Sequence, residues 1–400
     1  MDPHLIGSIT ALLFIACLVA IVADKLKQPY TIALVLTGLV VALTKITPNI
    51  HITHDVTFTL ILPPLLFYGA MHMDLERLKR NWRPIAMLAI PGVICSTFLI
   101  GFLVHKIIGL AIMPALLFGA LITPTDPISV LAILKRVGAP ERLRVILEGE
   151  SLFNDGTGVV VFSIILGIVT GHEDFQFGES VLKFFTVAGG GTVIGAALGY
   201  VVYRILKIID DHLVEVSLTV ALAFGTPLIA EAFHLSGIIA VVVAGLVIGN
   251  YGKLYSMSDK VRATLDHFWE VINFIINAIL FLIIGVELQV VRQDNFSLSV
   301  KVFFCAIFVV LISRLIVVYP VVWIKNRMSD QKISWKWAHV LFWGGLKGSL
   351  SIALVVGLPQ DFAHRSLFLS MAFAVVLFTL VVQGLTMKPL LKRLGVSEES

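Results

Sequence analysis

A polar segment interrupts one of the apolar stretches of this chain. It reads Glu148-Gly149-Glu150-Ser151-Leu152-Phe153-Asn154-Asp155-Gly156-Thr157-Gly158. On a helix, Ser151 and Asp155 share one face with Glu148, and Glu150 and Asn154 share the adjacent face. Hydroxyl and carboxylate oxygens suit a small monovalent cation, and a carboxylate also binds a proton. We therefore predict that a cation and a proton compete for Asp155, with Ser151 as a neighbouring ligand.

An ion-binding role explains this segment better than packing alone. A carboxylate in the middle of a membrane costs about 2.5–3.5 kcal/mol even on insertion scales. The alternative is a buried polar contact between helices. Glu148 lies nearer the cytoplasmic end, where it either lines a funnel to the site or is simply solvated.

A second polar segment, Thr123-Pro124-Thr125-Asp126-Pro127, also lies inside an apolar stretch. Pro127 lacks an N–H group and Pro124 clashes with the preceding turn, so the helix has to open here. Freed backbone groups are tolerated in a membrane when they line a cavity or find partners. We expect Thr125 and Asp126 to face an ion path. The alternative is a simple kink in which Asp126 accepts hydrogen bonds from loose N–H groups.

Two basic residues lie deep in apolar stretches. Arg314 requires an acidic partner if it is buried, and Glu150 is the best candidate. Lys347 lies in the glycine-rich segment Gly344–Ser349, where its charge can neutralise helix ends and the carboxylate of Asp126. The alternative for both cations is that they snorkel to an interface.

The elements that position these residues must be membrane helices. Of 400 residues, 58% are hydrophobic and only 14% are charged, which excludes a soluble enzyme and a nucleic-acid-binding protein. Since about 20 apolar residues cross a bilayer, the chain has room for about thirteen spans. We predict an all-α polytopic membrane protein with spans at 4–23, 30–45, 52–71, 84–105, 112–134, 145–170, 180–203, 213–232, 236–250, 263–288, 298–324, 337–357 and 366–386.

The basic residues orient these spans. With the N-terminus outside, 22 of the 30 lysines and arginines fall on the inner side and six on the outer side. The prediction is therefore N-terminus out and C-terminus in. The interrupted spans 5 and 12 cross in opposite directions, which indicates inverted repeats with two discontinuous helices and a site near the midplane.

The motifs resemble those of the sodium/proton antiporters of the NHE/NhaP type over the whole chain. The matching stretches are 62–67, Thr123–Pro127, Glu148–Gly158, 236–246, 281–288 and 344–351. The resemblance implies that Asp155 binds the cation and the proton with Asn154 beside it, and that Thr125, Asp126 and Ser151 are neighbouring site residues. It implies Na⁺ ligation by Asp155, Ser151 and Thr125, and a structural ion pair between Glu150 and Arg314. The Asn154-Asp155 pair resembles the electroneutral branch.

The resemblance also implies an organisation. A homodimer in the inner (plasma) membrane would have a moving core at about 84–170 and 298–386. Its scaffold would comprise about 4–71 and 180–288, followed by a short cytoplasmic tail at 387–400. The substrates would be Na⁺ or Li⁺ and protons, and the protein would contact membrane lipid. It would not be an enzyme, and it would use no cofactor and bind no nucleic acid.

Two departures stand out. Tyr68 replaces a glutamate that many prokaryotic relatives have, and Lys347 replaces an arginine, so bidentate contacts are lost there. K⁺/H⁺ exchange by the same family is the alternative function. A passive cation channel or a membrane sensor is the alternative from another class.

Overall fold

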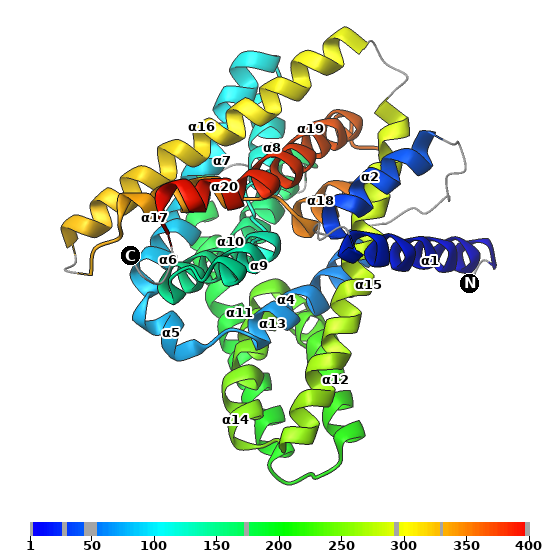
Figure 1. Ribbon diagram of the computed structural model, residues 1–400, viewed down its shortest axis with the longest axis vertical. Coiled ribbons are helices and arrows are strands. Elements are labelled where there is room, and N and C mark those ends of the chain that lie inside the picture. Colours follow the sequence, from blue (N-terminus) through cyan, green and yellow to red (C-terminus); the bar gives the residue numbers. More distant parts are fainter. Residues whose placement is uncertain are drawn as a thin grey trace.

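The computed structural model describes residues 3–25, 30–43, 54–171, 176–291, 296–328 and 331–396, whose regular secondary structure is helical, without a strand (Figure 1). The helical fold class is therefore confirmed. The helices are α1 (Pro3–Lys25), α2 (Tyr30–Leu43), α3 (His54–Val56), η1 (Thr57–Ile61), α4 (Leu62–Met71), α5 (Leu75–Arg80), α6 (Trp82–Ala89), α7 (Pro91–Ile108), α8 (Ile112–Ile122), α9 (Ile128–Val137), α10 (Glu141–Val169), α11 (Phe177–Leu206), α12 (His212–Ala232), α13 (Gly237–Val247), η2 (Ile248–Gly252), α14 (Lys253–Tyr255), α15 (Asp259–Val291), α16 (Phe296–Met328), α17 (Trp335–Trp343), α18 (Ser349–Val356), α19 (Arg365–Phe378), η3 (Thr379–Gly384) and α20 (Leu385–Leu394).

Short polar side chains begin several of these helices. Asp211 accepts hydrogen bonds from the N–H groups of Leu213 and Val214 at the start of α12, at 2.8 and 3.3 Å. Ser236 caps α13 in the same way, with a 3.1 Å bond from the N–H of Ile239. Such caps satisfy N–H groups that have no partner within the helix.

Eight helices of the described part are long and apolar enough to cross a membrane. The thirteen crossings and the orientation of the termini stay predictions. One end differs from the sequence expectation: the last helical run continues through α20 to Leu394, into the segment expected to be a tail. The α20 residues Met387 and Leu391 are buried while Lys388 is exposed, so this end is amphipathic. Residues 397–400 of that tail, and the ends of the predicted spans at 44–45 and 52–53, lie outside the described residues.

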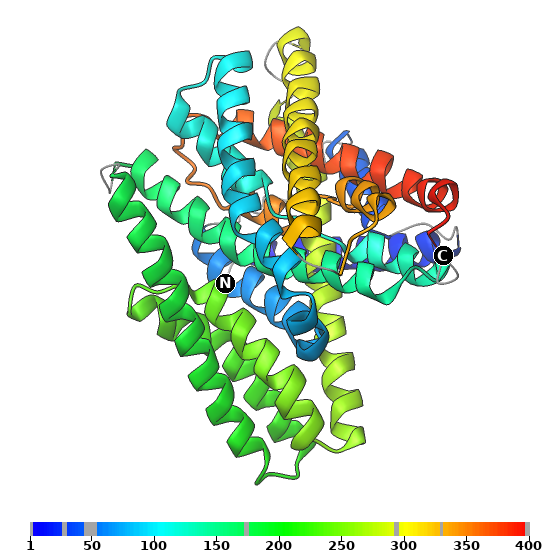
Figure 2. The ribbon, with the colours of Figure 1, turned by 90° about the vertical axis from the view of Figure 1, so that its left-hand side faces the viewer.

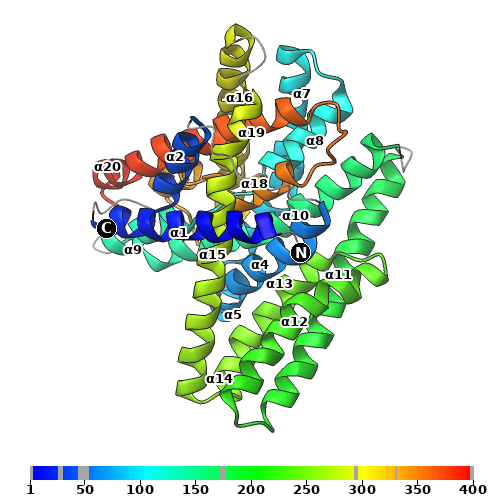
Figure 3. The same ribbon diagram turned by 90° about the vertical axis from the view of Figure 1, so that its right-hand side faces the viewer.

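The helices gather into two groups (Figures 1 and 2). One group contains α7, α8, α16 and α19, and the other contains α11, α12 and α13. The long helix α15 contacts α2 and α19 along one part of its length and α12 along another, so it links the two groups (Figure 3). The division into a moving core and a scaffold stays a prediction.

Two helical runs are interrupted at their centres. α8 ends at Ile122 and α9 begins at Ile128, while α17 ends at Trp343 and α18 begins at Ser349. The intervening segments are the proline-containing and glycine-rich motifs of the sequence. We call them the proline break (123–127) and the glycine break (344–348).

Candidate functional site

The two breaks meet in space, and we call the place where they meet the crossing. The N–H of Asp126 in the proline break donates a 2.8 Å hydrogen bond to the carbonyl of Leu346 in the glycine break. Backbone groups released from helical bonding thus find a partner in each other, which a buried position requires.

The carboxylate of Asp126 lies at the first residues of two helices. It accepts a 3.0 Å bond from the N–H of Ile128 in α9 and a bond from the N–H of Ser349 in α18. A side chain on Gly348 would collide with this carboxylate, so the approach requires glycine. A negative charge is favourable beside helix N-termini. This geometry corresponds to the alternative in which Asp126 satisfies loose N–H groups.

Lys347 is buried at the opposite kind of helix end. Its ammonium donates a 2.6 Å bond to the carbonyl of Thr123, just beyond the end of α8. Its backbone N–H donates to the hydroxyl of Thr379 at 3.1 Å. A cation is favourable at a helix C-terminus. This contact matches the expectation that Lys347 neutralises a helix end. The carboxylate of Asp126, by contrast, accepts hydrogen bonds from the backbone N–H groups of Ile128 and Ser349.

Helix α10 holds the proline break through Thr125. The side-chain amide of Asn154 donates to the Thr125 hydroxyl at 2.7 Å, and the Thr125 N–H donates to the Asn154 carbonyl oxygen at 3.3 Å. The hydroxyl of Ser151 donates to the carbonyl of Thr125. All three residues are buried. The structure therefore brings together Thr125, Ser151 and Asn154, and their polar atoms largely bind one another.

Asp155 differs from its neighbours. Its Oδ1 atom is buried and has no hydrogen-bond partner among the described residues. The charged groups that act on it are the carboxylate of Asp126 and the ammonium of Lys347. A buried carboxylate oxygen without a donor is costly, so it has strong reason to take a proton or a cation.

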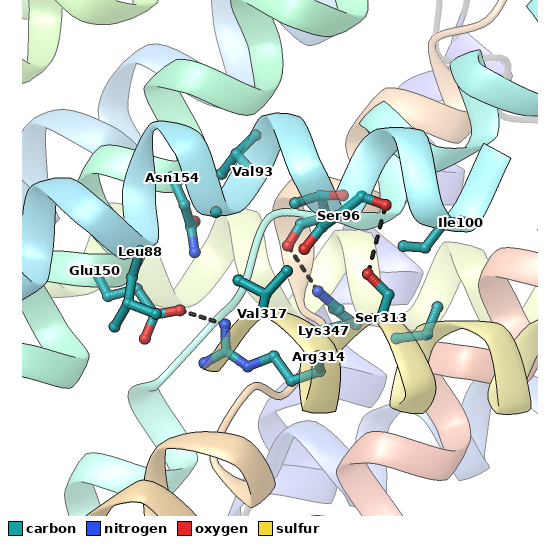
Figure 4. Close-up of a pocket in the computed structure, with 13 residues that line it drawn as sticks. Leu88, Val93, Ser96, Ile100, Glu150, Asn154, Ser313, Arg314, Val317 and Lys347 are labelled. Atoms are coloured by element: carbon teal, nitrogen blue, oxygen red, sulfur yellow. Dashed lines mark hydrogen bonds and ion pairs between the residues drawn. The ribbon is translucent and has the colours of Figure 1, made fainter. Parts of the chain in front are cut away.

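Glu150 and Arg314 form a buried ion pair between α10 and α16 (Figure 4). Arg314 also donates a 2.9 Å bond to the carbonyl of Leu341 in α17. A side chain on Gly345 would lie 2.6 Å from the guanidinium nitrogen Nε, so glycine leaves room for this cation. The pairing of Arg314 with Glu150 is the one expected from the sequence.

A small cavity of about 20 Å³ lies beside this pair, between α7, α10 and α16. Figure 4 shows Glu150 directed toward Arg314 and the Ser313 hydroxyl directed toward the carbonyl of Ser96. The cavity has room for about one water molecule. It is part of the support around the crossing and is too small for a transport path.

Glu148 is half-buried on α10 outside this cavity, and its charged neighbours are Lys135 and Arg144. The sequence reading missed Thr123, Leu341, Leu346 and Thr379. The first three act through backbone carbonyls, which leave no side-chain signal. Thr379 was visible only as a single polar residue in an apolar run.

Only part of this site suits a cation. Asp155 has an oxygen without a hydrogen-bond partner, whereas the hydroxyl and carbonyl oxygens of Thr125 accept bonds from Asn154 and Ser151. The described residues contain no group of three or more His, Cys, Asp or Glu that would hold a metal ion. The feature of this arrangement that suits a proton or a small cation is the unpartnered oxygen of Asp155.

Residues 11–393 match the family model described as "Sodium/hydrogen exchanger, transmembrane". The Na⁺/H⁺ antiporter NhaP of Pseudomonas aeruginosa is 45% identical over 348 residues, covering 85% of this chain and 81% of that protein. The Na⁺/H⁺ antiporter ApNhaP of Aphanothece halophytica is 40% identical over 369 residues, covering 92% of this chain and 70% of that protein.

A solved structure has the same fold. The sodium proton antiporter MjNhaP1 from Methanocaldococcus jannaschii superimposes with a TM-score of 0.85, covering 98% of this chain and 99% of that chain at 22% identity. The family match, the curated relatives and the shared fold agree. This chain belongs to the family of transmembrane sodium/hydrogen exchangers.

Proposed function

We propose that this protein exchanges Na⁺ for H⁺ across a membrane, with Asp155 carrying either ion by alternating access. Relatives with 40% and 45% identity are Na⁺/H⁺ antiporters by name, which supports Na⁺ over the K⁺ alternative. The observation that carries the proposal is the buried Oδ1 atom of Asp155, which lacks a hydrogen-bond partner in the described part of the chain.

The neighbouring charges favour one titrating group. Asp126 accepts backbone hydrogen bonds at two helix starts, and Glu150 is paired with Arg314. Asp155 is therefore the carboxylate that exchanges a bound proton for a bound cation. One carboxylate that holds either Na⁺ or H⁺ has the same net charge in both states, so exchange is electroneutral.

The cation site combines Asp155 with oxygens of Thr125 and Ser151. In the structure the Ser151 hydroxyl donates to the Thr125 carbonyl, so its lone pairs remain free to face an ion. Li⁺ uses the same oxygen ligands. Asn154 fixes Thr125 by two hydrogen bonds and thereby positions the site.

The remaining predicted residues support this site. Asp126 and Lys347 stabilise the helix ends at the crossing, and Glu150 with Arg314 joins α10 to α16. Glu148 lies on the cytoplasmic approach. We place the protein as a homodimer in the plasma membrane, with thirteen spans, the N-terminus outside and the C-terminus inside, working without a cofactor.

Reconstituted liposomes with an imposed pH gradient test this function. We expect uphill uptake of Na⁺ and Li⁺ coupled to proton movement, independent of membrane potential. Uphill uptake of K⁺ without uptake of Na⁺ or Li⁺ would replace the proposal with K⁺/H⁺ exchange. Dissipation of the gradient without uphill uptake would indicate a passive channel.

A further inference from the structure

A basic cavity lies away from the crossing, where α6 begins and α16 ends. It measures about 300 Å³, and five of the eight described residues that line it are basic, while none is acidic. The lining residues are Lys79, Arg80, Trp82, Arg83, Pro84, Arg142, Lys325 and Gln331.

Lys325 is the most informative of these residues. It is only 3% exposed, and its ammonium has no hydrogen-bond partner among the described residues. An ammonium buried without a partner is unfavourable by several kcal/mol in general, so an anion in the cavity would relieve it. The exposed lining residues Lys79, Arg80 and Arg83 add positive charge at the mouth.

Hydrogen bonds hold the side chain of Arg142 in place at one side of the cavity. Its guanidinium donates to the Asn81 side chain at 2.9 Å and to the carbonyls of Gln331 and Lys332 at 3.0 and 3.2 Å. These bonds join the start of α10 to α6 and to the segment before α17. The cavity therefore lies where three separate parts of the chain are held together.

An adjacent cavity of about 390 Å³ shares Arg80, Arg142 and Gln331 with the first. It contains one acidic residue, Glu141, which is paired with Arg77. Arg77 also pairs with Asp74 at 2.9 Å. Within the described residues, Glu141 and Asp74 beside the first cavity thus already pair with Arg77, and neither of them pairs with the basic residues that line it.

Two exposed tryptophans lie close to the cavity in the chain: Trp82 lines it, and Trp323 lies two residues before Lys325 in α16. Trp82 is 58% exposed with the Arg83 guanidinium 5.8 Å from its ring centre, and Trp323 is 47% exposed with Arg327 at 4.2 Å. Exposed tryptophans of membrane proteins concentrate at the headgroup level, and stacked arginines are typical of that zone.

We propose that this cavity binds the phosphate group of an anionic phospholipid, with Lys325 as the deepest contact and Arg80 and Arg83 at the mouth. Basic pockets between membrane helices on the cytoplasmic side are suited to anionic headgroups. Because the cavity lies at the contacts of α10 with α6 and with the 331–332 segment, an occupant stabilises the protein against unfolding.

Thermal unfolding of the purified full chain in detergent tests this site. The probes are cardiolipin, phosphatidylglycerol, phosphatidylcholine and inorganic phosphate, each titrated against the wild type and Lys325→Met. The methionine preserves the apolar stem and removes the unpartnered charge, so this variant folds at least as well as the wild type without lipid. Lys388→Met, an exposed lysine of α20, is the matched control.

We expect both anionic lipids to raise the unfolding temperature of the wild type and of Lys388→Met, with little effect of phosphatidylcholine. Lys325→Met should bind them about tenfold more weakly, and Arg83→Gln about fivefold more weakly. Equal stabilisation of the wild type and Lys325→Met by anionic lipid would overturn the proposal. A Lys325-dependent response to inorganic phosphate but not to lipid would show an anion site and overturn the lipid assignment.

Discussion

The proline break and the glycine break contribute opposite charges to one crossing. The proline break supplies Asp126, whose carboxylate receives N–H groups at the starts of both α9 and α18. The glycine break supplies Lys347, whose ammonium reaches the carbonyl of Thr123 beyond α8. Each break therefore stabilises a helix end that belongs to the other.

The residue types differ because proline and glycine change the helix in different ways. Proline lacks the N–H donor of a helical hydrogen bond and so opens the helix, and the carbonyl it leaves free, that of Thr123, is bound by Lys347. Glycine removes side chains, which lets Asp126 and Arg314 approach the backbone at Gly348 and Gly345.

Among the described residues, Asp155, Glu150 and Glu215 each have a buried carboxylate oxygen without a hydrogen-bond partner, but Glu150 is paired with Arg314 through its other oxygen. Asp155 therefore differs from the paired acid beside it.

The largest expected effect is that of Asp155→Asn. The amide keeps the shape of the side chain but cannot carry a proton or compensate a cation, so exchange should be lost while the protein stays folded. Exchange in liposomes and thermal unfolding measure the two properties. Glu231→Gln, an exposed acid of α12, should retain exchange. Exchange by Asp155→Asn at the rate of the wild type would remove Asp155 from its role.

Glu150→Ala tests the partnered carboxylate. It leaves Arg314 buried without its acid, which in general destabilises a protein by about 3–5 kcal/mol. We expect this loss in chemical unfolding of the purified protein. The double variant Glu150→Met with Arg314→Leu should be more stable than Glu150→Ala, because no charge is stranded. If Glu150→Ala were as stable as the wild type, the pair would not hold α10 to α16.

Lys347→Met tests the cross-linking of the breaks. It removes the donor to the Thr123 carbonyl, and hydrogen bonds involving a charged group contribute about 1.5–3 kcal/mol. We expect a corresponding loss of stability in chemical unfolding. The exposed Lys388→Met should change stability by less than about 0.5 kcal/mol. Equal stability of the two variants would contradict the assigned contact.

Ser151→Ala should have the smallest effect of this series. It loses one hydrogen bond to Thr125, worth about 1 kcal/mol, and weakens one neighbour of the cation. The apparent KM for Na⁺ should rise while exchange persists. Ser163→Ala, at an exposed position of the same helix, is the control and should leave KM unchanged. An unchanged KM for Ser151→Ala would remove Ser151 from the cation site.

The positions of both breaks followed from the sequence, because proline and clustered glycine rarely permit a continuous helix. The partner of Arg314 followed as well, since a buried cation needs an acid and Glu150 was the best placed. The cross-stabilisation of the helix ends did not follow. It depends on backbone carbonyls of Thr123 and Leu346, whose residue types say nothing about their partners.

The mutual binding of Thr125, Ser151 and Asn154 was also beyond the sequence. Helical spacing placed Ser151 and Asn154 on adjacent faces, but only the fold shows that both meet Thr125. The ends of helices were similarly approximate. The run that ends at Leu394 continues because Met387 and Leu391 are buried, a tertiary effect that composition does not reveal.

The most direct test of the central claim is the dependence of Na⁺ affinity on pH. If one proton and one cation compete for Asp155, lowering the pH should raise the apparent KM for Na⁺, by up to about tenfold per pH unit. The measurement is Na⁺-driven exchange in liposomes at several symmetrical pH values. We predict a KM that rises steadily toward acid with little change in the maximal rate. A KM that stays constant across this range would contradict competition at a single carboxylate.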